Sequence, residues 1–158
     1  MRERVPGVDK VEATETIDGR IVLQFSDGSF KDPFISRFVS DGTIKMFAYL
    51  VLLNDPKPHP LLCIEEPENY LHPELLTELA EEFREYANRG GQVFISSHSP
   101  DFVNSLELDE LFWLQKQKGH TNIKRAADDE AISSLFKDGD KLGYLWKQGY
   151  CIGSGPKK

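Results

Sequence analysis

The sequence is poor in cysteine and contains no long apolar stretch. Among 158 residues there are two cysteines, Cys63 and Cys151, and no CxxC pair. Such usage excludes a disulfide framework and is typical of a reducing cytoplasm, and the apolar neighbours of both thiols predict that they are buried. Nowhere do 18 apolar residues run together, and the first residues, MRERVPG, contain no apolar signal-peptide core. Membrane spanning and secretion are therefore not expected.

Positive charge is also scarce. The chain has 19 Lys and Arg against 26 Asp and Glu, a formal charge of -7 and a pI of about 5.1. Its basic residues are scattered, so the chain as a whole repels polyanions, and holding DNA or RNA would require a local basic patch. With 39% hydrophobic and 28% charged residues, the composition is that of a globular protein with a buried core.

The common phosphate-binding loop is absent as well. That loop has the form GxxxxGK[ST], in which backbone amides, the lysine and the hydroxyl hold phosphates and Mg²⁺. None of the 12 glycines is followed by Lys-Ser or Lys-Thr. A nucleotide site on this chain would therefore have no phosphate cradle of its own.

The pattern of the chain predicts an α/β fold that begins with antiparallel strands. In residues 11–30, β-branched and polar side chains alternate around Asp18-Gly19, which predicts a β-hairpin or a short meander. Apolar residues at helical spacing then predict a helix over 42–53, which Ser40 or Asp41 can cap.

A strand, a helix and a second strand follow. Residues 61–64 form a short apolar run, typical of a strand covered on both faces of a parallel sheet. Pro73 suits the first turn of a helix that continues to Arg89, and residues 92–96 predict the second strand. The default arrangement of such a unit is a right-handed parallel crossover. Short helices and a hairpin are predicted farther on, at 102–106, 110–115, 121–125, 128–136 and 142–146.

Three segments at the ends of these elements carry reactive side chains. The tetrad SDGT, residues 40–43, precedes a helix whose free N–H groups favour an anion such as phosphate, although a capped turn explains the same residues. Glu65 and Glu66 end a predicted strand, and carboxylates this close repel each other unless a cation or a reacting group lies between them. His98 follows the next strand, where a neutral histidine can donate to a phosphate oxygen or have a structural role.

Together these segments resemble those of ATP-binding-cassette ATPase heads. FVSDGTIKMFAYLVLL resembles the signature motif and signature helix, LLCIEEPENYLHP the Walker B and D-loop segment, and QVFISSHSPDF the switch-histidine segment. The subgroup resembled is the RecF/SMC/OLD-like one, which includes predicted bacterial ATPases of the AAA type. The resemblance extends over most of the chain, from the hairpin to GYLWKQG.

The resemblance implies a P-loop NTPase-like α/β fold with a mainly parallel sheet, and ATP hydrolysis with ATP and Mg²⁺ as cofactors. It implies that Glu66 is the catalytic acid, that His98 is the switch histidine and that Glu65 holds Mg²⁺ through water. The residues implied to contact ATP bound to a partner protomer are Ser40, Asp41, Gly42 and Thr43. Two positions depart from the family pattern: Glu65 replaces the usual aspartate, and His72 replaces the aspartate that ends transporter-type D-loops.

We therefore expect a single partial domain over 1–158, the C-terminal lobe of such a head. Its expected parts are a β-hairpin lead-in at 1–38, a motif-bearing core at 39–104 and C-terminal strands and helices at 105–158. The expected partners are a Walker A-containing N-terminal half and a second protomer, in a head-to-tail homodimer with ATP at the interface. The resemblance also allows DNA as a partner of the intact protein. Alone, the chain is expected to be inactive.

Other functions fit parts of the sequence. The lobe could be a non-catalytic dimerisation or docking module. A metal-dependent nuclease would use an acidic set of Glu65, Glu66, Glu68 and residues 128–130. A zinc site would have to combine His59, Cys63, His72 and His98, among which no pair has the usual ligand spacing.

Overall fold

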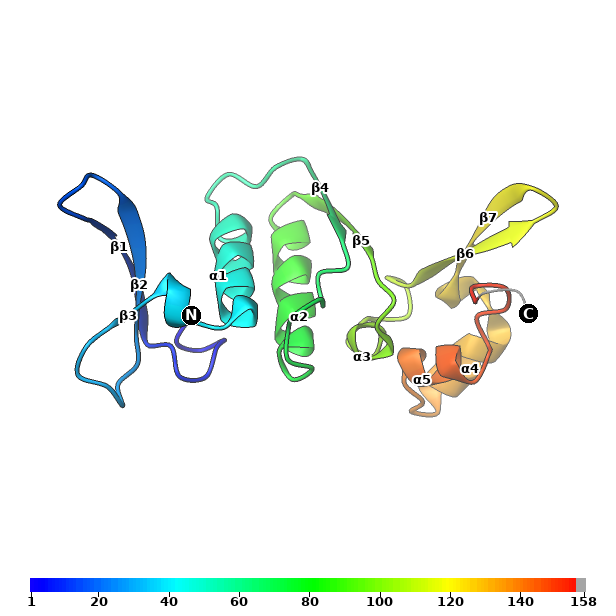
Figure 1. The fold of residues 1–158 in the computed structure, drawn as a ribbon. Coiled ribbons are helices and arrows are strands. Elements are labelled where there is room, and N and C mark those ends of the chain that lie inside the picture. Colours follow the sequence, from blue (N-terminus) through cyan, green and yellow to red (C-terminus); the bar gives the residue numbers. More distant parts are fainter. Residues whose placement is uncertain (156–158) are drawn as a thin grey trace. The chain divides into compact units, whose positions relative to one another are not determined.

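The computed structural model describes residues 1–155, which form two compact units that divide after Ser96. The first unit, 1–96, contains the antiparallel strands, the two longest helices and the parallel strand pair. The second unit begins at Ser97 and contains a β-hairpin and the shorter helices (Figure 1). The single domain expected over 1–158 stays a prediction.

The first unit begins with a three-stranded antiparallel meander. Strand β1 (Lys10–Glu15) pairs with β2 (Ile21–Ser26), which in turn pairs with β3 (Phe34–Ile35). The turn between β1 and β2 contains Gly19 with a φ of 78°, a left-handed conformation that glycine adopts without strain. The predicted hairpin or meander is thus confirmed.

Helix α1 (Asp41–Leu53) follows the meander and a short 3-10 turn, η1 (Ser36–Phe38). Ser40 is its N-cap, because the Ser40 hydroxyl accepts a 3.1 Å hydrogen bond from the backbone N–H of Thr43. The helix begins one residue before the predicted start. Its apolar face is buried against the rest of the unit through Met46, Leu50 and Leu53.

The next three elements form the predicted βαβ unit. Strand β4 (Leu61–Glu65) lies parallel to β5 (Gln92–Ser96), and α2 (Leu75–Asn88) connects them. Helices α1 and α2 lie side by side, and the Tyr49 and Phe83 rings meet edge to face with centroids 5.8 Å apart (Figure 1). Unlike the prediction, α2 begins at Leu75 and leaves Pro73 in the preceding turn.

One face of the parallel strand pair is exposed, which corrects two expectations. Side chains along β4 and β5 alternate between half-buried and exposed, and Leu61 and Phe94 are 53% and 56% exposed. Cys63 is exposed on β4, whereas Cys151 in the second unit is buried. The two strands are therefore not covered on both faces by the described residues, because such cover requires a further layer of chain.

The N-terminal segment is tied to α2 by Arg4. Its guanidinium pairs with Glu78 and Glu82 on that helix, and the Nε–Glu82 Oε1 distance is 2.9 Å. The hydrogen bond to Glu78 is the main cause that raises the pKa of Arg4, against the lowering effect of burial. Since Val5 and Val8 are also buried, this segment is an integral part of the first unit.

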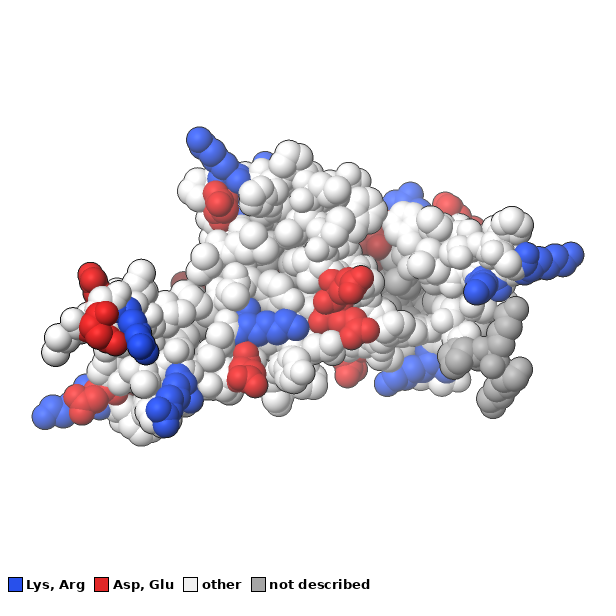
Figure 2. All heavy atoms as spheres, turned by 45° about the horizontal axis from the view of Figure 1, so that its top comes forward, with Lys and Arg blue, Asp and Glu red and all other residues white. Residues whose placement is uncertain are grey.

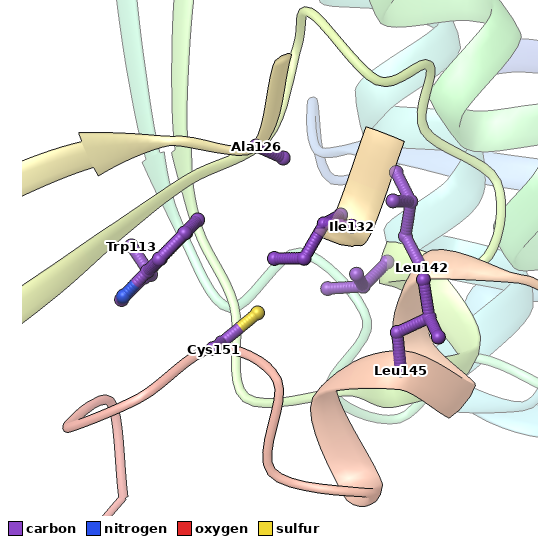
Figure 3. Packing of buried hydrophobic residues seen from close by; sticks show 7 residues of the cluster. Trp113, Ala126, Ile132, Leu142, Leu145 and Cys151 are labelled. Atoms are coloured by element: carbon purple, nitrogen blue, oxygen red, sulfur yellow. The ribbon is translucent and has the colours of Figure 1, made fainter. Parts of the chain in front are cut away.

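The second unit packs around an apolar cluster of seven buried residues. Its elements are α3 (Pro100–Val103), β6 (Phe112–Gln117), β7 (His120–Arg125), η2 (Ala126–Asp128), α4 (Glu130–Lys137) and α5 (Leu142–Lys147). The cluster consists of Val103, Trp113, Ala126, Ile132, Leu142, Leu145 and Cys151 (Figure 3). Burial, with a smaller contribution from the charge of Asp129, raises the pKa of the Cys151 thiol. The predicted hairpin and short helices of this region are confirmed, with ends shifted by a few residues.

Candidate functional site

The N-terminus of α1 lies directly against the turn that follows β4. A Cβ added to Gly42 would lie 2.5 Å from the carbonyl oxygen of Tyr70, closer than such atoms approach in proteins. Glycine at position 42 therefore has a packing role in this structure, because any side chain would push α1 away from the turn. Two of the three predicted segments are thus brought together within the first unit.

A hollow of about 810 Å³ lies beside this junction. Ser40, Gly42 and Thr43 line one part of it, and Tyr70, His72 and their neighbours line another. The Ser40 hydroxyl lies 2.8 Å from the Thr43 hydroxyl, so both are engaged with each other at the helix start. Free N–H groups at a helix start attract anions, and the hollow borders this helix start.

The paired glutamates occupy the carboxyl end of β4, as predicted. Glu65 is the last residue of the strand, pairs in register with Ser96 and has an exposed side chain. Glu66 begins the turn, and its backbone N–H donates a 2.8 Å hydrogen bond to the Ser96 carbonyl oxygen. The two carboxylates therefore leave the sheet from adjacent positions at its carboxyl edge, where open α/β sheets generally bind ligands.

The turn itself is held by hydrogen bonds around Glu66. The side-chain amide of Asn69 donates to Glu66 Oε2 at 2.7 Å, and the backbone N–H of Asn69 donates to the Glu66 carbonyl at 3.2 Å. From α1, the Lys45 ammonium donates to the carbonyl oxygens of Asn69 and Glu66, at 2.9 and 3.4 Å. Neither Lys45 nor Asn69 was a sequence-predicted site residue, because bonds to backbone carbonyls leave no periodic signal.

Tyr49 lies on α1 one turn after Lys45, and both burial and the charge of Glu68 in the acidic turn affect the pKa of its hydroxyl. Burial raises the pKa of its hydroxyl, and the charge of Glu68 raises it further. The same ring contacts Phe83, as described above, so this tyrosine packs α1 against α2. The acidic turn is thus packed on the helix that begins with the SDGT tetrad.

His98 belongs to the second unit. It is exposed, and it lies between the end of β5 and the start of α3. Next to it, the Ser97 hydroxyl accepts a 3.0 Å hydrogen bond from the N–H of Ser99, and the Ser99 hydroxyl caps α3. Serines on both sides of His98 therefore have structural roles, and the switch role of the histidine stays a prediction.

The donor set at the glutamates fits Mg²⁺ better than zinc. Mg²⁺ prefers oxygen ligands and commonly takes one or two carboxylates, completing its shell with water and substrate phosphates. Glu65 and Glu66 supply such carboxylates at one strand end. No group of three or more His, Cys, Asp or Glu side chains that could hold a metal occurs in residues 1–155, so the described part gives no support to a zinc site or a multi-acid nuclease site.

Comparison with known proteins gives the family. A family model described as "AAA domain, putative AbiEii toxin, Type IV TA system" matches residues 6–104, well over half of the chain. The chain belongs to this family of AAA domains. It therefore carries an ATPase-family domain of the ABC/AAA type, and the matched range contains the SDGT tetrad, both glutamates and His98.

Two further similarities agree with this family. The chain is 32% identical over 81 residues to the Old nuclease of Escherichia phage P2, and the match covers 51% of this chain and 14% of that protein. A solved structure from work on "Structural biochemistry of ATP-driven dimerization and DNA stimulated activation of SMC ATPases" has a TM-score of 0.58 and 14% identity. That match covers 87% of this chain and 84% of the other. The α/β, P-loop NTPase-like fold is thus confirmed.

Two physical features of the chain bear on its surroundings. Among residues 1–155, no helix is long and apolar enough to cross a membrane. On the face shown in Figure 2, blue lysines and arginines are scattered among red acidic residues, and no continuous basic surface forms there. That face therefore offers no broad attraction to a polyanion.

Proposed function

We propose that this chain is the C-terminal lobe of an ATP-hydrolysing head, which acts when a second polypeptide segment supplies the phosphate cradle. The observation that carries the proposal is the packing of the α1 N-terminus on the glutamate turn. It places an anion-attracting helix start and a carboxylate pair in one unit of a chain that belongs to the AAA family. These are two parts that phosphoryl transfer requires.

Each residue has a role in this proposal. Glu65 holds Mg²⁺ through water, and the ion, when bound, neutralises charge on the phosphates. Glu66 orients and deprotonates the water that attacks the γ-phosphate, and His98 contacts that phosphate as the switch residue. The SDGT residues Ser40, Asp41, Gly42 and Thr43 contact ATP held by a second protomer, in a head-to-tail homodimer.

The cradle is assigned to a different segment, the Walker A-containing N-terminal half of the complete protein. Two observations support this. No GxxxxGK[ST] string occurs in the chain, and the β4–β5 pair leaves Leu61, Cys63 and Phe94 exposed on one face. Because a parallel sheet is ordinarily covered on both faces, that face is a suitable seat for the missing half. Glu65 points from the same face, so the half seated there would bring its phosphates to the acidic end of β4.

The reactivity of the two thiols tests whether the cradle-bearing half binds to the exposed face of the β4–β5 pair. In the chain alone, exposed Cys63 should react with a thiol reagent at once, whereas Cys151, which is 5% exposed, should react only on unfolding. Addition of the cradle-bearing half should slow the labelling of Cys63 at least about tenfold, since the covering layer blocks access. Cys63→Ser should remove the fast phase and serve as the control. Equal labelling of Cys63 in both states would exclude the β4–β5 face as the seat.

ATP binding tests whether the phosphate cradle lies on a different segment from the glutamates and the SDGT tetrad. Titration calorimetry should detect no Mg-ATP binding by residues 1–158 at micromolar concentrations, because a helix start without a cradle supplies too few phosphate contacts. The complete protein should bind and hydrolyse ATP, and it should release phosphate only in the presence of Mg²⁺. Micromolar affinity of the chain alone would contradict the division of labour, and a complete protein that does not hydrolyse ATP would contradict the function.

The two alternatives predict other results. A docking module would bind its partner without phosphate release, so Glu66 could be replaced without effect on any activity. A metal-dependent nuclease would nick plasmid DNA with Mn²⁺ in the absence of ATP. DNA as a partner of the intact protein remains part of the proposal, and stimulation of ATP turnover by added duplex DNA would test it.

A further inference from the structure

The candidate base Glu66 has an unusual backbone conformation. Its φ is 43°, in the left-handed region, although Pro67 follows it and a residue before proline ordinarily takes an extended conformation. A non-glycine residue is strained in that region, and such a conformation persists only where its surroundings determine it. Tyr70, at the other end of the turn, also has a positive φ, 68°. The turn therefore needs contacts that hold it.

Lys45 provides contacts of this kind from outside the turn. Its ammonium donates to the Asn69 carbonyl at 2.9 Å and to the Glu66 carbonyl at 3.4 Å. The same nitrogen lies 5.6 Å from the centre of the Tyr49 ring and 5.9 Å from that of Tyr70, distances suited to cation–π attraction. One charged group thus contacts both ends of the turn and a neighbouring residue on α1.

Asn69 extends this contact to the carboxylate. While its carbonyl accepts from Lys45, its side-chain amide donates to Glu66 Oε2 at 2.7 Å. A chain of contacts therefore runs from the second turn of α1 through Asn69 to the oxygen atom of the candidate base. A hydrogen bond in which one partner is charged is stronger than a neutral one, which suits these contacts to fixing an orientation.

We propose that Lys45 is a positioning residue, which sets the orientation of the Glu66 carboxylate from the signature helix through Asn69. The inference rests on the proposed function, because it gives Glu66 the role of base. Ser40 caps α1, and Gly42 and Lys45 lie on that helix. A shift of the α1 N-terminus on binding phosphate would therefore also move the Lys45 ammonium, which contacts the Asn69 and Glu66 carbonyl oxygens. Phosphate binding at the SDGT tetrad would in this way be coupled to the orientation of the Glu66 carboxylate.

A purely structural role for Lys45 would give different results. If the lysine only stabilised the unit, its removal would lower overall stability and protection from hydrogen exchange throughout residues 1–96. If it positions Glu66, the effect should be confined to the turn. The readout must therefore resolve single amides and separate kcat from KM.

The first measurement is amide hydrogen exchange by NMR on residues 1–158. Lys45→Met keeps the length of the side chain and removes its charge and donors. We expect exchange of the Asn69 amide, which donates to the Glu66 carbonyl, to become at least about tenfold faster, with the amides of α2 unchanged. Lys57→Met, at an exposed loop position, is the matched control and should change neither. Unchanged exchange at Asn69 would overturn the proposal.

The second measurement is ATP turnover by the complete protein. Lys45→Met should lower kcat about tenfold to a hundredfold with KM unchanged, because misplacing a reacting group costs rate and not substrate affinity. Lys45→Arg keeps the charge and donors and should recover most of the rate. Faster exchange without a loss of kcat would overturn the positioning role. Failure of the proposed function is distinguishable, because turnover would then be insensitive to Glu66→Gln even where the exchange effect is present.

Discussion

Replacing Glu66 by glutamine should abolish most ATP turnover by the complete protein while leaving ATP binding intact. General base catalysis contributes about 10²- to 10⁴-fold, so kcat should fall by that factor. Glutamine has the same size, and its amide oxygen can accept the hydrogen bond that Asn69 donates to Glu66 Oε2 at 2.7 Å. The turn should therefore keep its shape, and only the proton acceptor is lost.

The measurement is phosphate release at saturating Mg-ATP, with nucleotide affinity followed in parallel. Glu85→Gln is a suitable control, because Glu85 is an exposed acid on α2 and does not line the hollow beside the SDGT tetrad. It should change turnover by less than about twofold, as expected of a surface substitution. If Glu66→Gln turned over ATP like the wild type, or lost ATP binding as well, the assignment of Glu66 as the base would be wrong.

Replacing Gly143 by alanine should strongly destabilise the second unit. A Cβ at this position in α5 would collide with the Pro100 carbonyl oxygen and lie 2.8 Å from Asn104 Oδ1. The same Asn104 oxygen accepts a 2.9 Å hydrogen bond from the Gly143 N–H, which ties the start of α5 to α3. Alanine normally stabilises a helix relative to glycine, but here it must separate the two helices. We expect a net loss of about 1–3 kcal/mol or more.

Tryptophan fluorescence during urea unfolding measures this loss selectively. Both tryptophans of the chain, Trp113 and Trp146, lie in the second unit, and Trp113 is part of its buried cluster. Gly155→Ala is the control, because a Cβ there would meet no atom within 4 Å. It should shift the unfolding free energy by less than about 0.5 kcal/mol. A Gly143→Ala chain as stable as the wild type would show that α3 and α5 are not packed this closely.

Local pattern predicted the secondary structure well because each element of this chain carries its own signal. The helical spacing of Ile44, Phe47, Ala48 and Val51 and the Ser40 cap predict α1 to within one residue. The buried face is nevertheless that of Met46, Leu50 and Leu53, and Val51 is 59% exposed. The apolar run before Glu65 predicts β4 in the same way. Whether both faces of β4 are buried could not be predicted in this way, because burial depends on other segments that pack against the strand. For that reason Cys63 was wrongly expected to be buried.

The motifs of the candidate site could be predicted from the sequence, but the residues whose hydrogen bonds hold the turn could not. The glutamates and the SDGT tetrad were found by type and order, and the resemblance gave them roles. Gly42 was expected to serve a phosphate, yet the structure gives it a packing reason as well, the close approach of Tyr70. Lys45 and Asn69 were missed because a lysine on a helix and an asparagine in a turn are common, and only their mutual contact is informative.

Mixing two inactive variants of the complete protein tests the central claim most directly, namely that SDGT of one protomer and Glu66 of the other serve the same ATP. One variant carries Glu66→Gln and the other Ser40→Arg. If the motifs act across a two-fold dimer, each mixed dimer contains one intact site, and turnover should return to about a quarter of the wild-type rate. A mixture as inactive as its components would contradict the shared site.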